Sequence, residues 1–285
     1  MPELEPSEAV AAIELTAERI ATPCGEGDMV WRLWGQGRPL VLLHGAFGSW
    51  NHWLRNILSL SRHFRLLVPD MPGYGDSAMP PPPFSPERLA AIIAVGIAEI
   101  IGSESSLDMA GFSFGGIIAG HVAARLGPRL EHLVLVGPNG MALPYAEIGD
   151  IRGLGENMSE AELRAVHRHN LGRLMIAKAE KIDALAIYLQ IENAARARFK
   201  SGRIPASDSL LRVLPEIRAR ISGIWGEADV WAVPYLAERE TTLRRFQPNL
   251  DFRVIPDAGH WAPYEAPEAV NGALLEMLRA PARTS

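Results

Sequence analysis

The chain has 285 residues, 48% of them hydrophobic and 21% charged, a composition typical of a globular protein and not of a disordered one. The net charge of −5 gives no basic footprint for nucleic acid, and no apolar run is long enough for a transmembrane helix, so we expect neither nucleic acid nor a membrane as a partner. The N-terminus lacks the features of a signal peptide, and the single cysteine, Cys24, allows no internal disulfide, which together predict a cytoplasmic protein.

The first third of the chain alternates short apolar runs with turns and helical patterns. The expected strands are residues 29–34, 39–43 and 64–68, preceded by residues 11–20, which could form a strand or a short helix and for which we favour an edge strand. Residues 39–43 are continuously apolar, as in a strand that is covered on both faces, and residues 64–68 also read as a buried strand. A helix is expected from Ser85 to about Ile101, because Ser85 can act as the N-cap and Pro86 is favoured at the first helical position.

The stretch from Leu107 to Gly120 reads as a strand, a tight turn and a helix. The turn carries a G-x-S-x-G sequence with Ser113 at its centre, which is the context of a nucleophile elbow. The tight turn leaves no room for side chains two positions before and after the serine, which gives Gly111 and Gly115 a steric reason to be there. The amide of Phe114 opens the helix, where unpaired N–H groups favour negative charge.

Three further strands are expected after the elbow. Residues 151–220, which show helical periodicity and no convincing strand, separate the first of them from the other two. These strands are residues 133–136, 221–225 and 252–255, and helices are expected over 234–246 and 267–278. Repeated strand–helix units predict an α/β fold with a mostly parallel, doubly wound sheet. Ligands of such sheets bind beyond the carboxyl ends of the strands, where Ala46, Ser113, Asp229 and His260 all lie.

The chain resembles the serine-nucleophile branch of the α/β-hydrolase superfamily. It carries five motifs of that family, and they appear in the family's order. The motifs are H-G-A-F-G-S (44–49), D-M-P-G-Y-G-D-S (70–77), G-F-S-F-G-G (111–116), G-E-A-D (226–229) and A-G-H-W (258–261). The resemblance implies an α/β-hydrolase core over residues 1–138 and 216–285, with a helical cap inserted over residues 139–215.

The resemblance also implies a catalytic triad. A serine hydroxyl needs a neighbouring base to act as a nucleophile at neutral pH. Ser113 would be the nucleophile, His260 the base and Asp229 the acid that orients the imidazole. Glu227 is the nearest substitute for Asp229, and Asp257 is too near His260 in sequence to reach behind the ring. Asp70 and Asp76 match a structural loop of the family.

The backbone amides of Ala46 and Phe114 would form the oxyanion hole, in which donors bind the charge that develops on the carbonyl oxygen. Five residues near these motifs are candidates for the substrate pocket, and all but one are aromatic. They are Phe47, Trp50, Asn139, Trp231 and Trp261. For each aromatic residue, ordinary core packing is the alternative interpretation.

The expected function is hydrolysis of a small carboxylic ester, with an apolar acyl group, through an acyl-enzyme. The first alternative is a hydrolase of carbon–carbon bonds in meta-cleavage products, which shares G-H-W at 259–261 but usually has asparagine where this chain has Phe112. The second alternative is a non-catalytic binder of small molecules with the same fold. No metal or nucleotide motif is present in the sequence, so no cofactor and no metal is expected. The sequence leaves the oligomeric state open.

Overall fold

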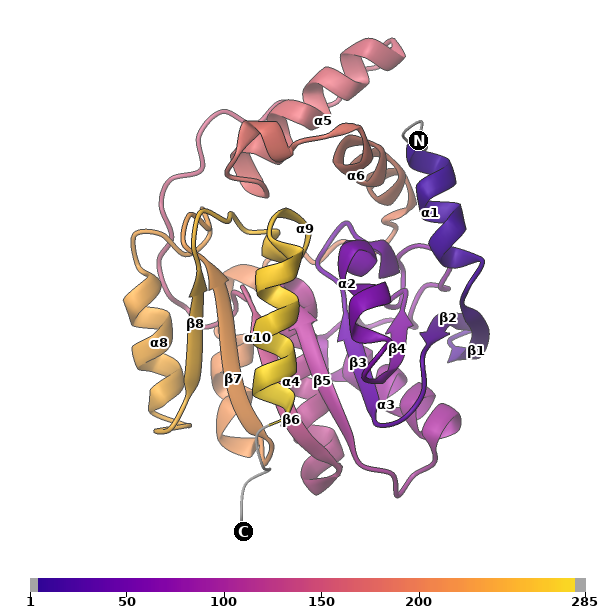
Figure 1. Ribbon diagram of the computed structural model, residues 1–285, viewed down its shortest axis with the longest axis vertical. Coiled ribbons are helices and arrows are strands. Elements are labelled where there is room, and N and C mark those ends of the chain that lie inside the picture. The colour runs from indigo at the N-terminus through magenta and orange to yellow at the C-terminus, as the bar shows by residue number, and fades with distance from the viewer. Residues whose placement is uncertain (1–4, 280–285) are drawn as a thin grey trace.

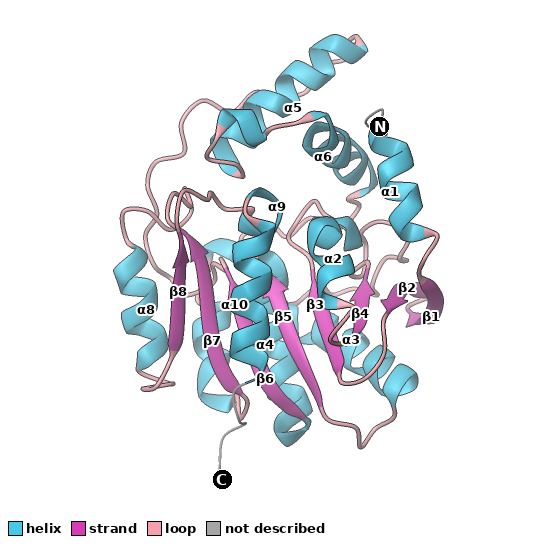
Figure 2. Cartoon of the chain, viewed as in Figure 1, coloured by secondary structure: helices cyan, strands magenta, loops and turns pink. Residues whose placement is uncertain are grey.

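The computed structural model describes residues 5–279, whose strands form one eight-stranded sheet with helices on both faces (Figures 1 and 2). The strands are β1 (Glu18–Cys24), β2 (Gly27–Trp34), β3 (Pro39–Leu43), β4 (Arg65–Pro69), β5 (Leu107–Phe112), β6 (Leu130–Val136), β7 (Arg220–Gly226) and β8 (Asp251–Ile255). Their order in the sheet is β1-β2-β4-β3-β5-β6-β7-β8. Strand β2 is antiparallel to both of its neighbours, and every other pair is parallel, as the sequence predicts.

Two helical layers enclose the sheet. The helices are α1 (Pro6–Glu14), α2 (Leu54–Leu60), α3 (Pro86–Ile101), α4 (Phe114–Leu126), α5 (Glu160–Leu174), α6 (Ala184–Arg196), α7 (Ser209–Val213), α8 (Leu236–Arg244), α9 (Ala262–Glu265) and α10 (Pro267–Arg279). Apolar side chains of α3, α4 and α8 pack in the core on one face, and those of α2 and α10 pack on the other (Figure 1). The central strands are therefore covered on both sides, which explains why β5 is buried along its whole length and β3 is buried beyond its first residue.

The N-terminal region differs from the prediction of a strand over residues 11–20. Helix α1 occupies residues 6–14, and β1 begins only at Glu18. Pro6 is the first residue of the helix, and Glu5 and Glu8 form a capping box that satisfies its first amides. The prediction was wrong because these capping residues precede the apolar run and favour a helix.

Strands β3 and β5 are neighbours in the sheet although β4 and α3 separate them in sequence. The chain leaves β3 toward β4 on one side, and it continues from β5 toward β6 on the other. A parallel sheet is open for a ligand at such a reversal of strand order, just beyond the carboxyl ends of the two strands. The loop after β3 and the turn after β5 are the two segments that meet there.

Between β6 and β7 the described chain contains helices and no strand, which agrees with the helical segment expected from the sequence. Helices α5 and α6 lie above the carboxyl ends of the strands (Figure 1). Helix α7 instead packs on α4, with Leu210 and Val213 against Gly120 in the core. The division of the chain into a core and a cap at residues 139 and 215 stays a prediction.

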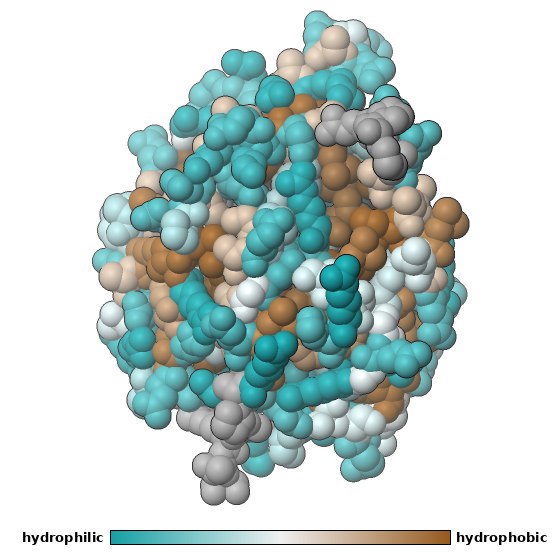
Figure 3. Space-filling model, in the orientation of Figure 1, coloured by the Kyte–Doolittle hydropathy of each residue, from teal (hydrophilic) through white to brown (hydrophobic). Residues whose placement is uncertain are grey.

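The surface of this face of the molecule is mainly hydrophilic, with apolar groups gathered near α1 and α2 and in a second patch near β8 and α8 (Figure 3). Among residues 5–279, no helix combines the length and the apolar character needed to cross a bilayer.

The elbow glycines provide a test of the fold. A methyl group on Gly115 would lie 2.3 Å from the carbonyl oxygen of His44 and 2.6 Å from that of Leu43. Because both are backbone atoms, β3 and α4 would have to separate, and Gly115→Ala is expected to lower the free energy of unfolding by about 1–3 kcal/mol in a urea titration. The control is Gly272→Ala in α10, where a methyl group meets nothing within 4 Å, so that variant should be as stable as the wild type or slightly more stable. Equal stability of the two variants would contradict the close approach.

Candidate active site

Ser113 lies in the tight turn between β5 and α4. Its φ of 52° and ψ of −120° are an uncommon conformation for a residue with a side chain. The turn is held by hydrogen bonds from the Ser113 amide to the Val136 carbonyl (2.8 Å) and from the Gly116 amide to the Ser113 carbonyl (2.9 Å). A methyl group on Gly111 would lie 2.5 Å from the Gly115 carbonyl oxygen, so the glycines have the steric role that the sequence predicts. The strain presents the Ser113 hydroxyl at the end of the strand.

His260, in the loop after β8, lies next to this hydroxyl. Its Nε2 is 2.9 Å from Ser113 Oγ, and its Nδ1 is 3.0 and 2.9 Å from the two carboxylate oxygens of Asp229. Asp229 follows β7 and is fully buried. Since an ionised carboxylate can only accept hydrogen bonds, Nδ1 carries the proton and Nε2 is free to accept one from the serine. The three side chains that the sequence singles out therefore form one hydrogen-bonded chain.

The loop that carries Asp229 is itself fixed. Asp229 Oδ1 accepts a hydrogen bond from the Trp231 amide (2.9 Å), and the Asp229 carbonyl accepts from the amides of Ala232 and Val233. The two other acids considered for this role lie elsewhere. Glu227 accepts a hydrogen bond from the Asp257 amide, and Asp257 pairs with Lys178.

The loop after β3 passes directly beside Ser113. A methyl group on Gly45 would lie 3.2 Å from Ser113 Cβ. Ala46 and Phe114 both line the cavity next to the serine, and the Phe114 amide is at the first position of α4, where it has no intrahelical acceptor. Ala46 and Phe114 therefore line the same cavity as Ser113, and the oxyanion hole formed by their amides stays a prediction.

Two buried histidines support the loop after β3. His52 Nδ1 accepts a hydrogen bond from the Gly45 amide (3.2 Å), and His44 Nε2 accepts one from the Met71 amide (2.8 Å). His44 Nδ1 donates to the Gly45 carbonyl at 2.7 Å. Burial lowers the pKa of His44 to about 4, although Asp70 and the Gly45 carbonyl act in the opposite direction. Burial, and then the proximity of His44 and His260, lowers the pKa of His52 well below its ordinary value. Both rings are therefore neutral structural supports.

Asp70 connects this loop with the next one. Its carboxylate accepts hydrogen bonds from the Trp50 amide (2.9 Å), the Asp76 amide (2.9 Å) and the Arg32 guanidinium (3.0 Å). Arg32 also pairs with Asp76. Asp70 and Asp76 thus stabilise turns and lie in an ion network, in agreement with the structural role that the sequence analysis assigned to them.

Glu265 holds the His260 loop against the helical segment, and the sequence analysis missed it. The buried carboxylate accepts hydrogen bonds from the amides of Gly259 (2.7 Å), Ala177 (3.0 Å) and Lys178 (2.7 Å). The Trp261 amide also donates to the Met175 carbonyl. A glutamate near a helix start is an ordinary sequence feature, so no pattern in the sequence marks it.

A cavity of about 410 Å³ opens above Ser113 between the sheet and the helical segment. Its lining residues are Ala46, Phe47, Ser113, Phe114, Asn139, Tyr145, Asn170, Leu171, Leu174, Met175, Gln190, Ser201, Gly202, Pro205, Ala206 and Trp231. None of these residues carries a formal charge. Phe47, Asn139 and Trp231 are thus in the cavity wall, where the sequence analysis expected them.

Two of the expected pocket residues lie elsewhere. Trp50 is buried against Trp34, and the Arg32 guanidinium lies 5.1 Å from the centroid of its ring. Trp261 is fully buried, stacks on Tyr264 at 4.3 Å and donates its indole N–H to the His52 carbonyl. Their expected place in the pocket was wrong because their side chains point into the core on the α2 and α10 side of the sheet.

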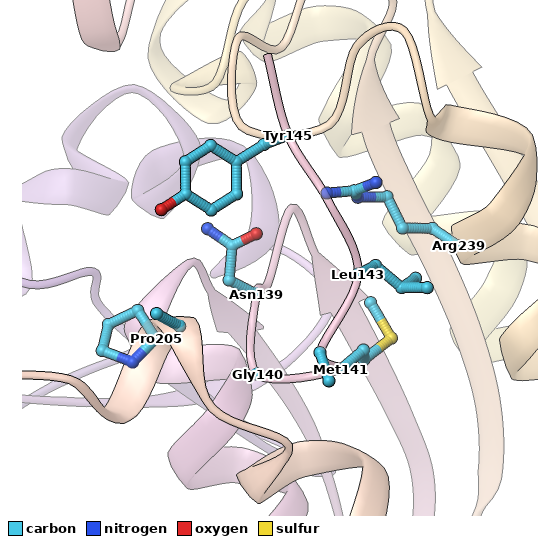
Figure 4. A pocket seen from close by; sticks show the side chains of 9 residues that line it. Asn139, Gly140, Met141, Leu143, Tyr145, Pro205 and Arg239 are labelled. Atoms are coloured by element: carbon cyan, nitrogen blue, oxygen red, sulfur yellow. The ribbon is translucent and has the colours of Figure 1, made fainter. Parts of the chain in front are cut away.

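A smaller cavity of about 30 Å³ shares part of its lining with the large one, and Figure 4 shows the residues around it. Asn139, Tyr145, Pro205 and Ala206 line both cavities. Arg239 reaches this cavity from α8, and its guanidinium donates to the carbonyls of Tyr235, Pro144 and Trp231. Arg239 therefore ties the loop after Asp229 to the chain that leaves β6.

Other groups considered for chemistry are not assembled into a site. Within residues 5–279, no three His, Cys, Asp or Glu side chains gather as metal ligands would. Cys24 is buried, and burial followed by the charge of Asp28 raises the pKa of its thiol to about 11. A thiol with that pKa is a poor nucleophile at neutral pH.

The sheet topology, the serine elbow and the position of the cavity are those of a hydrolase enzyme of the α/β-hydrolase fold. The chain belongs to the alpha/beta hydrolase family, whose model matches residues 40–273.

Known relatives include two kinds of hydrolase. The chain is 29% identical to 2-hydroxymuconate semialdehyde hydrolase of a Pseudomonas species, over 81% of this chain and 83% of the relative. It is 26% identical to pimeloyl-[acyl-carrier protein] methyl ester esterase of Vibrio cholerae, over 83% and 86%. Among solved structures, a thermophilic esterase from Thermogutta terrifontis matches with a TM-score of 0.66 and 25% identity, over 92% of this chain and 98% of that chain.

The neutral state of His44 leads to a prediction about stability. Because the folded-state pKa of about 4 is below the ordinary value of 6.5, the unfolded chain binds this proton first, and stability falls as the pH drops from 6.5 to 4. A difference of about 2.5 pKa units corresponds to a loss on the order of 3 kcal/mol.

His44→Gln keeps a side-chain acceptor but cannot be protonated in this range. Urea unfolding at several pH values should give the variant a lower free energy of unfolding than the wild type at pH 7. As the pH falls from 6.5 to 4, that free energy should decrease less in the variant than in the wild type. The same loss of unfolding free energy in both proteins would show that His44 does not contribute.

Proposed function

We propose that this protein is a serine hydrolase that cleaves a small, uncharged carboxylic ester through an acyl-enzyme. The observation that carries the proposal is the hydrogen-bonded chain from Ser113 through His260 to Asp229 at the base of a cavity without charged lining residues.

In the first half of the reaction, His260 Nε2 takes the proton of Ser113 as Oγ attacks the ester carbonyl carbon. The negative charge that develops on the carbonyl oxygen is bound by the amides of Ala46 and Phe114. Asp229 stabilises the imidazolium that forms. The C–O bond to the alcohol then breaks, and His260 gives its proton to the departing alkoxide oxygen.

In the second half, water enters the site and His260 accepts one of its protons. The resulting hydroxide attacks the acyl-enzyme, the same two amides bind the oxyanion, and the bond to Ser113 Oγ breaks. His260 returns the proton to Oγ, so the products are a carboxylic acid and the free enzyme. The burial of Asp229 and His260 keeps competing water away from their hydrogen bonds.

The lack of charged residues in the cavity lining favours an uncharged ester as substrate over the substrate of a carbon–carbon bond hydrolase. The relative from Pseudomonas acts on a muconate semialdehyde, a compound whose carboxylate carries a charge. Moving a carboxylate from water into an apolar cavity is costly unless a cation or several donors meet it. The cavity here offers amides, hydroxyls and apolar side chains, and the ammonium of Lys200 lies over Phe47 without being part of the lining.

The alternative of a non-catalytic binder needs the cavity but not the hydrogen bond between Ser113 and His260. That bond, at 2.9 Å, supports catalysis over simple binding.

Replacement of the nucleophile is the direct test. With p-nitrophenyl butyrate as substrate, Ser113→Ala should lower kcat by about a thousandfold or more, since Ser113 carries the hydroxyl that is hydrogen-bonded to His260. The control is Ser105→Ala, an exposed serine before β5 that should retain wild-type kcat. Equal turnover by Ser113→Ala and the wild type would refute the serine mechanism, and a wild type that binds the ester without turnover would favour the binder.

Substrate charge provides a second test. The p-nitrophenyl esters of butyric acid and of succinic acid have similar length, but the second carries a free carboxylate. The uncharged ester should have a kcat/KM at least about tenfold higher, because the carboxylate loses hydration without gaining a cation. A preference for the charged ester, or efficient turnover of a muconate semialdehyde, would favour the carbon–carbon bond hydrolase instead.

A further inference from the structure

Asn193 of α6 forms a buried polar link between the helical segment and the loop after β3. Its Oδ1 accepts hydrogen bonds from Ser49 Oγ (2.9 Å) and Asn51 Nδ2 (3.1 Å), and its Nδ2 donates to Asn51 Oδ1 (2.7 Å). All three side chains are buried, with Asn193 only 4% exposed. The two asparagines exchange hydrogen bonds in both directions, so neither amide group can rotate freely.

The loop that Asn193 contacts needs such support. Phe47, directly after the proposed oxyanion residue Ala46, has a φ of 52°, which is unfavourable for a residue with a bulky side chain. Such a conformation persists only when the surroundings hold it. Two hydrogen bonds to buried side chains anchor the loop. The Gly45 amide donates to His52, and the Trp50 amide donates to Asp70.

Asn193 supplies a third anchor, which comes from the helical segment. It binds Ser49 and Asn51. Along the chain, the strained Phe47 therefore follows the residue held by His52 and precedes the residues held by Asn193 and Asp70. The end of α6 is in turn fixed to the loop at 73–77, because Arg196 pairs with Asp76, and the amides of Arg198 and Phe199 donate to the Gly73 carbonyl.

We propose that Asn193 is a positioning residue for the oxyanion hole, through which the helical segment holds the Ala46 amide in place. The inference rests on the proposed ester hydrolysis. An oxyanion donor acts only when it is placed to within about 0.5 Å of the developing charge. Loss of the Asn193 carboxamide would leave the carboxamide N–H and oxygen of Asn51 without these partners and would remove the acceptor of the Ser49 hydroxyl proton, and the loop would move to satisfy these buried groups.

The test compares Asn193→Ala with a matched control, Asn271→Ala. Asn271 of α10 accepts a hydrogen bond from Asn56 of α2 (2.9 Å) and is similarly buried, so its side chain is bonded to a helix and not to Ser49 or Asn51. Both variants should have a lower melting temperature. With p-nitrophenyl butyrate, Asn193→Ala should lower kcat roughly tenfold with KM within about twofold, and Asn271→Ala should change neither by more than about twofold.

A structural readout accompanies the kinetics. In hydrogen exchange followed by mass spectrometry, Asn193→Ala should speed exchange in the peptide that covers residues 44–51, and Asn271→Ala should not. Ser49→Ala, a milder change in the same link, should act in the same direction and add little to Asn193→Ala in the double variant.

The outcomes separate this inference from the proposed function. A wild type without ester turnover refutes the proposed function, and the exchange data still test the anchor. A wild type with turnover that Ser113→Ala abolishes, together with unchanged kcat and unchanged exchange in Asn193→Ala, refutes the role of Asn193 alone. Equal losses of kcat in Asn193→Ala and Asn271→Ala would show a general loss of stability instead of positioning.

Discussion

The turn between β5 and α4 sets the geometry of the whole site, because it holds Ser113 in a conformation that few residues adopt. Gly111 allows α4 to begin close to β5, and Gly115 allows α4 to approach the end of β3, and there is no room for a methyl group on either glycine. This close contact places the hydroxyl beyond the end of β5, where the loops that follow β3, β7 and β8 can meet it. Without the turn, His260 would have no serine hydroxyl at hydrogen-bonding distance.

The helical segment between β6 and β7 contributes more than a cover for the cavity. It contacts the loop with Ala46 through Asn193, and it contacts the loop with His260 through the amides that Glu265 binds. Both loops are therefore held from the sheet below and from the helices above. Such support on two sides keeps functional side chains within a narrow range of positions.

The sequence allowed much of the site to be predicted. The side chains of Ser113, His260 and Asp229 meet because each follows the carboxyl end of a parallel strand, a position that periodicity and turn residues reveal. The aromatic candidates were less predictable. Trp231 lines the cavity, whereas Trp50 and Trp261 are in the core, since an aromatic residue type indicates burial but not the direction in which its side chain points.

Local sequence alone determined the strand–helix order, the parallel sheet and the elbow, because these depend on the spacing of apolar residues and on where glycine is sterically required. The capping residues at Glu5 and Glu8 also determined α1, although the apolar run after them reads equally well as a strand. Only the tertiary structure decided which polar side chains would be buried together. Glu265 with Ala177, and Asn193 with Ser49, come from segments distant in sequence, and their pairing depends on how α6 and the chain around residue 177 pack over the sheet.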